Sequence, residues 1–380
     1  MERILVVGMN ENPGGIESVI MNYYRHMDRT KLQFDFLCNS DKIAYYEEIK
    51  ELGGNIYVIP SKRKSYIKYK QELKKIFKER ALNYIAIWYN SCNLNNIDYM
   101  KYAKKYNIKY RIIHAHNSQN MGTSLIEKAY NMLFHNKNKY LLGKYATDFW
   151  TCSKIAGKFF YRKKYRKTEK YKVINNAIDV FKFKFDKDIR ENYRREMQLE
   201  NKIVIGNIGR LHFQKNQKFA IDIFSEICKE NDNYILLLIG QGEDEEELRK
   251  KVKAQQLEDK VCFLGVRKDV QNLLQAMDIL LFPSKFEGLP VTLIEAEASG
   301  IDILTSMEAF PEETELTKNV LRLSLNDKID NWKEKILMLS SNLKESDRVS
   351  KSQNNISIIR KCGYDIETEA RKMQKYFVNI

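Results

Sequence analysis

Two successive series of short apolar runs, separated by segments of helical length, constrain the fold of this chain more than any other feature. The first series comprises RILVVG (3–8), FDFLCN (34–39), NIYVIP (55–60), YIAIWYN (84–90), YRIIHAH (110–116), DFWTCS (148–153) and KVINNAI (172–178). The second comprises IVIGNIG (203–209), YILLLIG (234–240), VCFLG (261–265), ILLFPS (279–284) and IDILTS (301–306). Such alternation is typical of parallel strands buried on both faces. The sequence therefore predicts two doubly wound α/β domains.

The restart of this pattern near residue 180 predicts the domain boundary. A chain of 380 residues is longer than one ordinary domain, and we predict Rossmann-like domains over residues 1–180 and 181–362. Ligands of such domains bind outside the carboxyl ends of the strands. We therefore expect a ligand site in a cleft that both domains face.

The positive charge of the chain is concentrated in its first half. The net charge is +15, and residues 1–180 hold 33 Lys and Arg against 16 Asp and Glu. Two basic runs, residues 61–80 and 158–172, mix Lys and Arg with Tyr, Phe or Ile at roughly helical spacing. Such runs suit an anionic membrane surface. A solvated, lysine-rich helix face is an equally weighted alternative.

The cysteines and the start of the chain indicate the compartment. The six cysteines stand singly, without a C-x-x-C pair or a His partner at metal-ligand spacing, which is typical of reduced thiols in a cytosolic protein. The first apolar run is too short for a signal peptide, and no later run has the length of a spanning helix. We expect a cytoplasmic protein.

Glycine-containing junctions between strand and helix suggest phosphate binding. Gly14 and Gly15 follow the first strand and precede a helical pattern, where small residues let backbone N–H groups approach an anion at the positive end of the helix. The spacing is not G-x-G-x-x-G, so a simple tight turn is the alternative.

A second junction, GNIGRLHFQKN (206–216), places Arg210 and Lys215 in one loop after a strand that ends at Gly209. A guanidinium and an ammonium that converge there could bind a diphosphate, the Arg as a bidentate fork and the Lys as a point charge. Two exposed surface cations are the alternative.

A third junction, KFEGLPVTLIEAEASG (285–300), reads as a turn followed by a helix that begins at Pro290 and stops at Gly300. The helix N-terminus would present the free amides of Gly288, Leu289 and Val291 to a phosphate.

The carboxylates of this stretch are expected to bind hydroxyl groups. Glu287 lies at the mouth of the predicted cleft, and Glu295 lies about 7.5 Å beyond Pro290 along the helix axis. Because neither can favour a phosphate directly, we expect one to accept hydrogen bonds from a sugar and the other from a ribose. An ordinary helix glutamate is the alternative for Glu295, and we expect Glu297 to be solvated.

These motifs together resemble a known family. EGLPVTLIE, preceded by GRL-x3-KN and by the glycine-containing loop after the first strand, resembles the retaining nucleotide-sugar glycosyltransferases of family four, bacterial polysaccharide-building members included, which have the GT-B architecture. The resemblance covers nearly the whole chain. It implies that Arg210 and Lys215 hold the donor diphosphate, that Glu295 binds the ribose and that Glu287 contacts the donor sugar, assisted by the turn amides of Gly288 and Leu289.

The resemblance also implies roles outside these motifs. Gly15 would lie beside the phosphates from the opposite, acceptor-side domain, and His116 near the sugar, although His114 shares the same strand face and either could be structural. Val266 would lie near the base, with Gly209, Gly240 and Gly242 as backbone elements of the donor side. A helix over residues 363–380 would return to the N-terminal domain. The family's Asn-Gly-x-Asp turn stands here as Asn-Ala-Ile-Asp (176–179), which puts the turn conformation in doubt.

The family analogy implies transfer with retention, without cofactor or metal, from a nucleotide sugar such as a UDP-sugar. The only D-x-D, residues 186–188, is interpreted as a chance match. We expect a saccharide acceptor, lipid-linked and belonging to capsule or exopolysaccharide synthesis, a peripheral contact with the inner membrane face and no nucleic acid. An epimerase or phosphorylase on the same fold, or an RNA- or membrane-binding protein with a vestigial cleft, are the alternatives.

Overall fold

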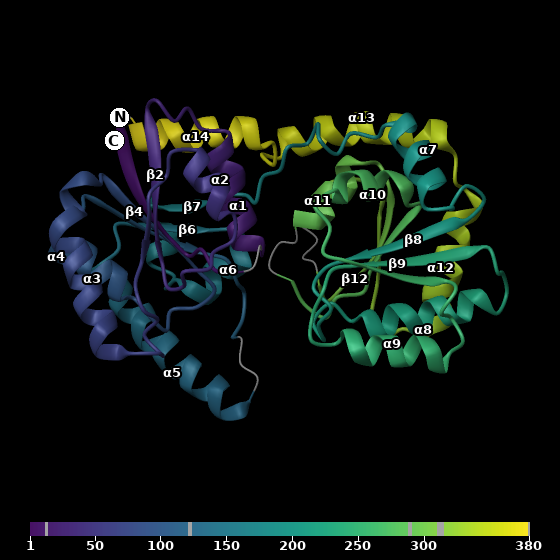
Figure 1. Cartoon of the computed structure of the whole chain (residues 1–380), viewed down its shortest axis with the longest axis horizontal. Coiled ribbons are helices and arrows are strands. Elements are labelled where there is room, and N and C mark those ends of the chain that lie inside the picture. The colour runs from purple at the N-terminus through teal and green to yellow at the C-terminus, as the bar shows by residue number, and fades with distance from the viewer. Residues whose placement is uncertain (12–13, 121–123, 288–290, 310–314, 379–380) are drawn as a thin grey trace. The chain divides into compact units, whose positions relative to one another are not determined.

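The computed structural model describes residues 1–11, 14–120, 124–287, 291–309 and 315–378 (Figure 1). The chain divides into two compact units, which we call unit 1 (Met1–Ala177 with Ile366–Ile380) and unit 2 (Ile178–Asp365). The chain therefore leaves unit 1 after Ala177 and enters it again at Ile366. The sequence-based boundaries lay after residues 180 and 362.

Within its described residues, unit 1 contains a seven-stranded parallel sheet in the order β3-β2-β1-β4-β5-β6-β7. The strands are β1 (Glu2–Val7), β2 (Leu32–Cys38), β3 (Ile56–Val58), β4 (Ala86–Ser91), β5 (Tyr110–Ala115), β6 (Asp148–Thr151) and β7 (Tyr171–Val173). The helices are α1 (Gly15–Arg25), α2 (Tyr46–Glu51), α3 (Tyr66–Arg80), α4 (Asp98–Lys105), α5 (Leu125–Leu141), α6 (Lys154–Phe160) and α14 (Ile366–Val378), with short 3-10 turns at Ala81–Asn83, Leu142–Lys144 and Tyr165–Lys167.

Helices cover both faces of this sheet, which is why its strands are continuous apolar runs. On one face, α3, α4 and α6 pack over β1, β4 and β5 in one hydrophobic cluster. On the other face, Trp88 meets Tyr23 of α1, and Trp150 meets Phe377 of α14 at a ring-centroid distance of 5.6 Å. Tyr376 of α14 also donates a hydrogen bond to the buried Asp148. The last helix is thus part of the core of unit 1.

In the described part of unit 2, a six-stranded parallel sheet has the order β10-β9-β8-β11-β12-β13. The strands are β8 (Ile203–Ile208), β9 (Tyr234–Ile239), β10 (Val261–Gly265), β11 (Ile279–Phe282), β12 (Asp302–Ser306) and β13 (Val320–Leu323). The helices are α7 (Lys187–Glu196), α8 (Gln217–Cys228), α9 (Glu245–Ala254), α10 (Val270–Ala276), α11 (Val291–Ala298), α12 (Ile329–Ser341) and α13 (Glu345–Lys361).

Unit 2 is also covered on both faces. One hydrophobic cluster joins the sheet to α8, α9 and α12, and another joins it to α10, α11 and α13. The two strand orders are those of doubly wound sheets, and the predicted fold class of two Rossmann-like α/β domains is confirmed. The cleft that the prediction placed between the domains stays a prediction.

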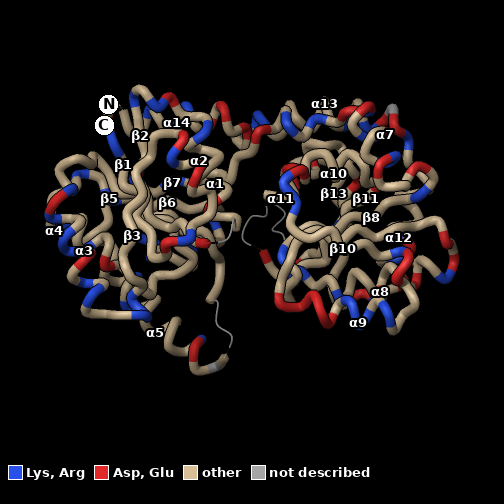
Figure 2. Tube along the Cα trace, viewed as in Figure 1, with Lys and Arg blue, Asp and Glu red and all other residues tan. Residues whose placement is uncertain are grey.

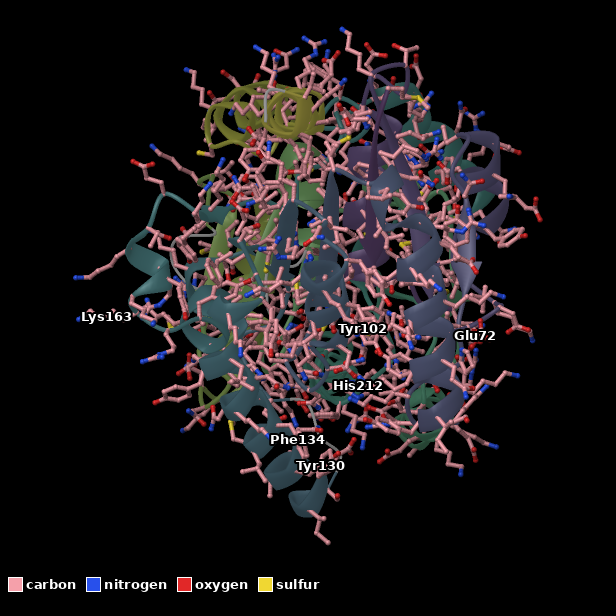
Figure 3. All side chains as sticks on the ribbon, turned by 90° about the vertical axis from the view of Figure 1, so that its left-hand side faces the viewer. Glu72, Tyr102, Tyr130, Phe134, Lys163 and His212 are labelled. Atoms are coloured by element: carbon pink, nitrogen blue, oxygen red, sulfur yellow. The ribbon has the colours of Figure 1, made fainter. Side chains whose placement is uncertain are left out.

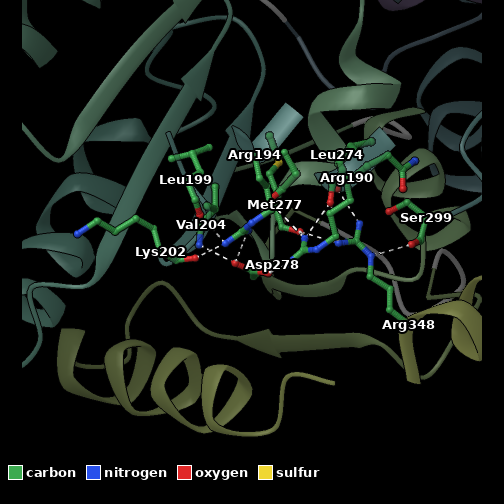
Figure 4. Close-up of polar contacts among 12 residues, drawn as sticks. Arg190, Arg194, Leu199, Lys202, Val204, Leu274, Met277, Asp278, Ser299 and Arg348 are labelled. Carbon is green, nitrogen blue, oxygen red and sulfur yellow. Dashed lines mark hydrogen bonds and ion pairs between the residues drawn. The ribbon is translucent and has the colours of Figure 1, made fainter. Parts of the chain in front are cut away.

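An arginine cluster fixes the carboxyl end of α10 in unit 2 (Figure 4). Arg348 of α13 donates to the carbonyl oxygens of Leu274, Gln275, Met277 and Ser299 at 2.6–3.2 Å. Two further arginines of α7, Arg190 and Arg194, bond the same turn and the carboxylate of Asp278. These side chains take up the carbonyl groups that a helix end leaves without partners.

The predicted basic run 61–80 forms α3, whose Tyr69, Leu73 and Phe77 are buried in the core of unit 1. The lysines of α3 are exposed except Lys70, which pairs with the buried Asp98 of α4, and Figure 2 shows Lys and Arg along α3 and α4. This arrangement favours the solvated helix face for this run.

All six cysteines are free thiols. In the described part of the chain, no helix combines the length and the apolar character needed to cross a membrane.

Candidate active site

The loops that follow β8 and β11 meet at the carboxyl edge of the unit 2 sheet. These strands are neighbours, and the strand order reverses between them, which is where ligands of doubly wound domains bind. Asn216 donates to the carbonyl oxygen of Pro283 at 3.1 Å, and Gln214 donates to that of Phe286 at 2.9 Å. Asn216 itself has a left-handed φ of 60° directly before α8. These bonds hold the two loops together.

An ion pair lies at this junction. Lys215 Nζ is 2.7 Å from Glu287 Oε1, and the two side chains are 18% and 7% exposed. The ammonium also lies over the ring of Phe282, 4.7 Å from its centroid. Gln214 Nε2 makes a longer contact of 3.4 Å to the other Glu287 oxygen. The structure thus brings together two of the residues that the sequence singled out.

Arg210, on the same loop, pairs with a different carboxylate. Its guanidinium lies 2.9 Å from Glu243, and its side chain is 68% exposed. His212 Nε2 lies 3.2 Å from the other oxygen of Glu243. The sequence analysis singled out neither Glu243 nor His212, because their pairing depends on the contact between the loops after β8 and β9. The convergence of Arg210 and Lys215 on one anion stays a prediction.

Glycines allow the loops after β8 and β9 to touch. Gly209 and Gly240 have φ values of 154° and 132°, and a Cβ on Gly240 would lie 2.1 Å from the Gly209 carbonyl oxygen. A Cβ on Gly242 would lie 2.0 Å from the oxygen of Leu211. Only glycine fits positions 240 and 242 without moving the backbone. Val266, the predicted neighbour of the base, follows β10 and is 61% exposed.

The helix after the β11 loop is α11, which carries Glu295. Glu295 is half-buried, and burial raises the pKa of its carboxyl to about 7, while Lys182 acts in the opposite direction. A carboxyl with such a pKa can donate as well as accept hydrogen bonds near neutral pH. The predicted amide donors Gly288 and Leu289, and the predicted helix start at Pro290, lie outside the described residues.

The expectation of a solvated Glu297 is wrong. Glu297 is fully buried, and Thr317 donates a hydrogen bond of 2.6 Å to its Oε2. The reason is that this side of α11 packs within unit 2 toward α13, where Asn355 donates to the Glu297 carbonyl oxygen. Burial raises the pKa of the Glu297 carboxyl to about 8, although the hydrogen bond from Thr317 lowers it.

The histidines of unit 1 lie at the carboxyl end of β5. His116 Nε2 is 2.8 Å from Asn90 Oδ1, and burial lowers the pKa of His116 to about 3. His114 is fully buried against Trp88, and burial, with the neighbouring His116, holds its pKa well below the ordinary value. Both rings are therefore neutral near pH 7. His116 keeps some exposed surface and His114 has none, so a ligand could reach only His116.

The glycine-containing loop after β1 is closed by a carboxylate that the sequence reading missed. Glu17 Oε2 accepts from the Gly14 amide at 3.1 Å, and Glu17 Oε1 accepts from the Asn10 side chain at 2.7 Å. This is the glutamate half of a capping box, because Gly14 has no side chain to accept the return bond, and G-x-x-E was its signal. Since the Gly14 amide is taken, the predicted approach of an anion is left to Gly15, beside which a Cβ would meet no atom within 4 Å.

The chain is similar in sequence to glycosyltransferases. Residues 188–355, within unit 2, match the family described as Glycosyl transferases group 1. EpsF of Bacillus subtilis (strain 168), which carries a provisional glycosyltransferase name, is 29% identical over 340 residues, 88% of this chain and 87% of EpsF. A UDP-Gal:alpha-D-GlcNAc-diphosphoundecaprenol alpha-1,3-galactosyltransferase of Escherichia coli is 29% identical over 143 residues, 36% of this chain and 36% of that protein.

The structure is similar to that of HepE from Anabaena, solved in complex with UDP and glucose. The TM-score is 0.78 over 100% of both chains at 16% sequence identity. At this identity the likeness concerns the fold alone, and it agrees with the GT-B class of two Rossmann-like domains. Residues 188–355 of unit 2 therefore match the glycosyl transferases group 1 family, and the chain as a whole is similar to glycosyltransferases in sequence and in fold.

Proposed function

We propose that the protein transfers a sugar from a nucleotide-sugar donor to a saccharide acceptor, with retention of the anomeric configuration and without a metal ion. The observation that carries this proposal is the Lys215–Glu287 ion pair at the junction of the β8 and β11 loops, with Arg210 on the same loop. A cation beside a carboxylate offers one group for a diphosphate and one for sugar hydroxyls.

Each side chain has a proposed role in the donor complex. The diphosphate replaces Glu243 as the partner of Arg210 and binds Lys215, because a doubly charged phosphate chain attracts these cations more strongly than one carboxylate does. Glu287, which Lys215 keeps in place, accepts hydrogen bonds from the donor sugar. Glu295 binds the ribose hydroxyls, for which its raised pKa allows both donation and acceptance.

The departing nucleoside diphosphate is stabilised in this proposal by fixed charges. Lys215 is held by Glu287 and the ring of Phe282 before the reaction, so little reorganisation of this cation is needed when negative charge develops. Arg210, in contrast, exchanges Glu243 for the diphosphate when the donor binds. A phosphate oxygen of the leaving group takes the proton of the acceptor hydroxyl on the same sugar face. His116, as a neutral imidazole, offers a hydrogen bond to a sugar hydroxyl.

We further propose a UDP-sugar as the donor and a lipid-diphosphate-linked saccharide as the acceptor, within capsule or exopolysaccharide synthesis. The UDP bound by HepE supports the first choice. The diphosphoundecaprenol acceptor in the name of the Escherichia coli relative supports the second. Such an acceptor would place the enzyme at the cytoplasmic face of a membrane.

The donor site is tested by thermal-shift screening with UDP, GDP and ADP. A ligand at a hundred times its dissociation constant adds about 2.7 kcal/mol of stability. We expect UDP to raise the melting temperature of the wild type and Glu295→Ala to abolish that rise. An equal response to all three nucleotides, or an unchanged response in Glu295→Ala, would refute the assignment.

The reaction is tested by turnover of UDP-sugars with a lipid-linked acceptor. Arg210→Ala and Lys215→Ala are each expected to reduce turnover by orders of magnitude while circular dichroism stays unchanged. The anomeric coupling constant of the product, measured by NMR, reports retention. Inversion would refute the proposed stereochemistry, and an epimerised nucleotide sugar formed without acceptor would indicate the epimerase alternative.

A further inference from the structure

Helix α5 of unit 1 buries polar side chains. Asn131, His135 and Asn138 are only 4%, 2% and 7% exposed. Asn138 donates to the carbonyl oxygen of Leu94 at 2.6 Å, and the Leu94 amide donates to His135 Nδ1 at 3.2 Å. The other ring nitrogen of His135 bonds the carbonyl oxygen of Phe159 at 3.1 Å. The helix is thus anchored to unit 1 by hydrogen bonds along its inner face.

The outward face of α5 carries mostly apolar side chains, with the exposed Lys137 among them. Ile126, Tyr130, Leu133 and Tyr140 are 84%, 58%, 67% and 65% exposed. At 100° per residue these positions fall on one side of the helix, over a length of about 21 Å. Surface helices normally show the opposite polarity. Such an inversion indicates that something apolar covers this face.

Figure 3 shows Tyr130 and Phe134 near the free end of α5 and Lys163 reaching outward from the same unit. The rings of Tyr130 and Phe134 lie 4.5 Å apart. This end of the helix therefore presents a small aromatic cluster rather than isolated side chains.

The surroundings of this face are strongly basic. Residues 124–172 contain 13 Lys and Arg against 3 Asp and Glu. Of the three acids, Asp148 is buried and Glu127 lies 3.4 Å from Arg63. Arg162 lies over the ring of Tyr140, 4.4 Å from its centroid, so the basic segment after α6 adjoins the apolar face. An apolar stripe bordered by cations has the chemistry of a helix that lies at an anionic lipid surface.

We propose that the outward face of α5, defined by Ile126, Tyr130, Leu133 and Tyr140, docks on a bilayer that contains anionic phospholipid. The inference deepens the proposed function and rests on it, because a lipid-linked acceptor has to be met at a membrane. A second copy of the chain is disfavoured, since it would bring two strongly basic surfaces together. A nucleic acid could stack on Tyr130 and Tyr140, but it is disfavoured because the two most exposed side chains of this face, Ile126 and Leu133, offer it neither a hydrogen bond nor a stacking ring.

Vesicle flotation of the full chain tests this surface. We expect the wild type to float with vesicles of phosphatidylcholine and phosphatidylglycerol and not with phosphatidylcholine alone. Ile126→Ser/Leu133→Ser should lower the partition coefficient at least about tenfold, because it removes the two most exposed aliphatic side chains of the stripe. The matched control is Leu82→Ser/Val58→Ser, which changes exposed aliphatic residues of unit 1 outside α5 and should float like the wild type.

Two further measurements separate this inference from the proposed function. The UDP thermal shift, recorded without vesicles, should persist in Ile126→Ser/Leu133→Ser; its absence in the wild type would refute the donor site and not the docking surface. Equal flotation of the wild type and this variant would overturn the docking surface. So would a concentration-dependent dimer, or binding of single-stranded RNA, that the same variant abolishes without affecting flotation.

Discussion

Lys215 and Glu287 depend on each other because their ion pair is largely shielded from water. Removing one partner would leave the other buried without a counter-charge, which destabilises more than removing both. The pair therefore has a structural part and a proposed catalytic part, and substitutions can separate the two.

A double-mutant cycle makes this separation. Lys215→Met and Glu287→Gln should each lower the free energy of unfolding by about 2–3 kcal/mol, and the double variant by clearly less than the sum. Urea unfolding at neutral pH measures all four proteins. Turnover should fall in each variant, including the double. Additive losses of stability, or a double variant with recovered turnover, would contradict these separate roles.

Glu297 predicts a pH dependence of stability. Its pKa is raised to about 8 from an ordinary 4.5, chiefly by burial. Below the unfolded value the carboxyl is protonated in both states, so stability is greatest there; it is lost as pH rises toward 8, because only the unfolded chain ionises. Glu297→Gln keeps the shape without the ionisation and should gain stability on the order of a few kcal/mol at about pH 8.5, and little at about pH 4.5.

Unfolding free energies at the two pH values check this prediction. The exposed Glu334 of α12 provides the control Glu334→Gln, which should leave the difference between the two pH values unchanged. An equal effect of Glu297→Gln at both pH values would show that the carboxyl is ionised in the fold.

At the scale of elements, α10 is short and ends inside unit 2, where water cannot satisfy its last carbonyl groups. Arg348 supplies donors to that end from α13, and burial lowers its pKa to about 9. β11 begins directly after α10 and leads to the loop that carries Glu287. By fixing the end of α10, this cluster also fixes where β11 begins, and so helps to position the candidate site.

Arg348→Met should accordingly lower the free energy of unfolding by about 2–4 kcal/mol, because it leaves buried carbonyl groups without donors. Thermal unfolding measures the loss. Arg249→Met, which removes an exposed pair within α9, is the control and should change stability by less than about 0.5 kcal/mol. A comparable loss in both variants would mean that the cluster has no special role.

Strands could be predicted from the sequence where a run of apolar residues was enough to indicate them. The apolar runs predicted β1 to β12, but β13 escaped because it is a four-residue edge strand interrupted by Arg322. The Lys215–Glu287 contact follows from the topology, since both loops leave neighbouring strands. The Arg210–Glu243 pair, the burial of Glu297 and the polar inner face of α5 depend on three-dimensional neighbours that spacing along the chain does not specify.

At the scale of the whole molecule, unit 2 is a continuous segment, whereas unit 1 is built from two segments. The hydrophobic clusters of unit 2 are formed by its own residues. Unit 1 instead needs α14, whose Met373, Tyr376 and Phe377 pack beside Tyr23 and Trp150.

The segment 178–365, expressed alone, should therefore fold and keep the UDP-induced thermal shift. The segment 1–177 alone should unfold at lower temperature than the same unit in the full chain, because it lacks the apolar surface of α14. Calorimetry of both fragments and of the full chain makes the comparison. A 178–365 fragment without a cooperative transition would show that unit 2 requires unit 1.

The return of the chain into unit 1 has a consequence for biosynthesis. Residues 178–365 emerge from the ribosome after Ala177 and before α14, which takes roughly 10–40 s at about 5–20 residues per second. During that interval the nascent first segment carries an uncovered apolar face around Trp150, while the intervening unit can already fold. Chaperones that bind nascent chains would bind this apolar face, and they would be released when α14 packs against it.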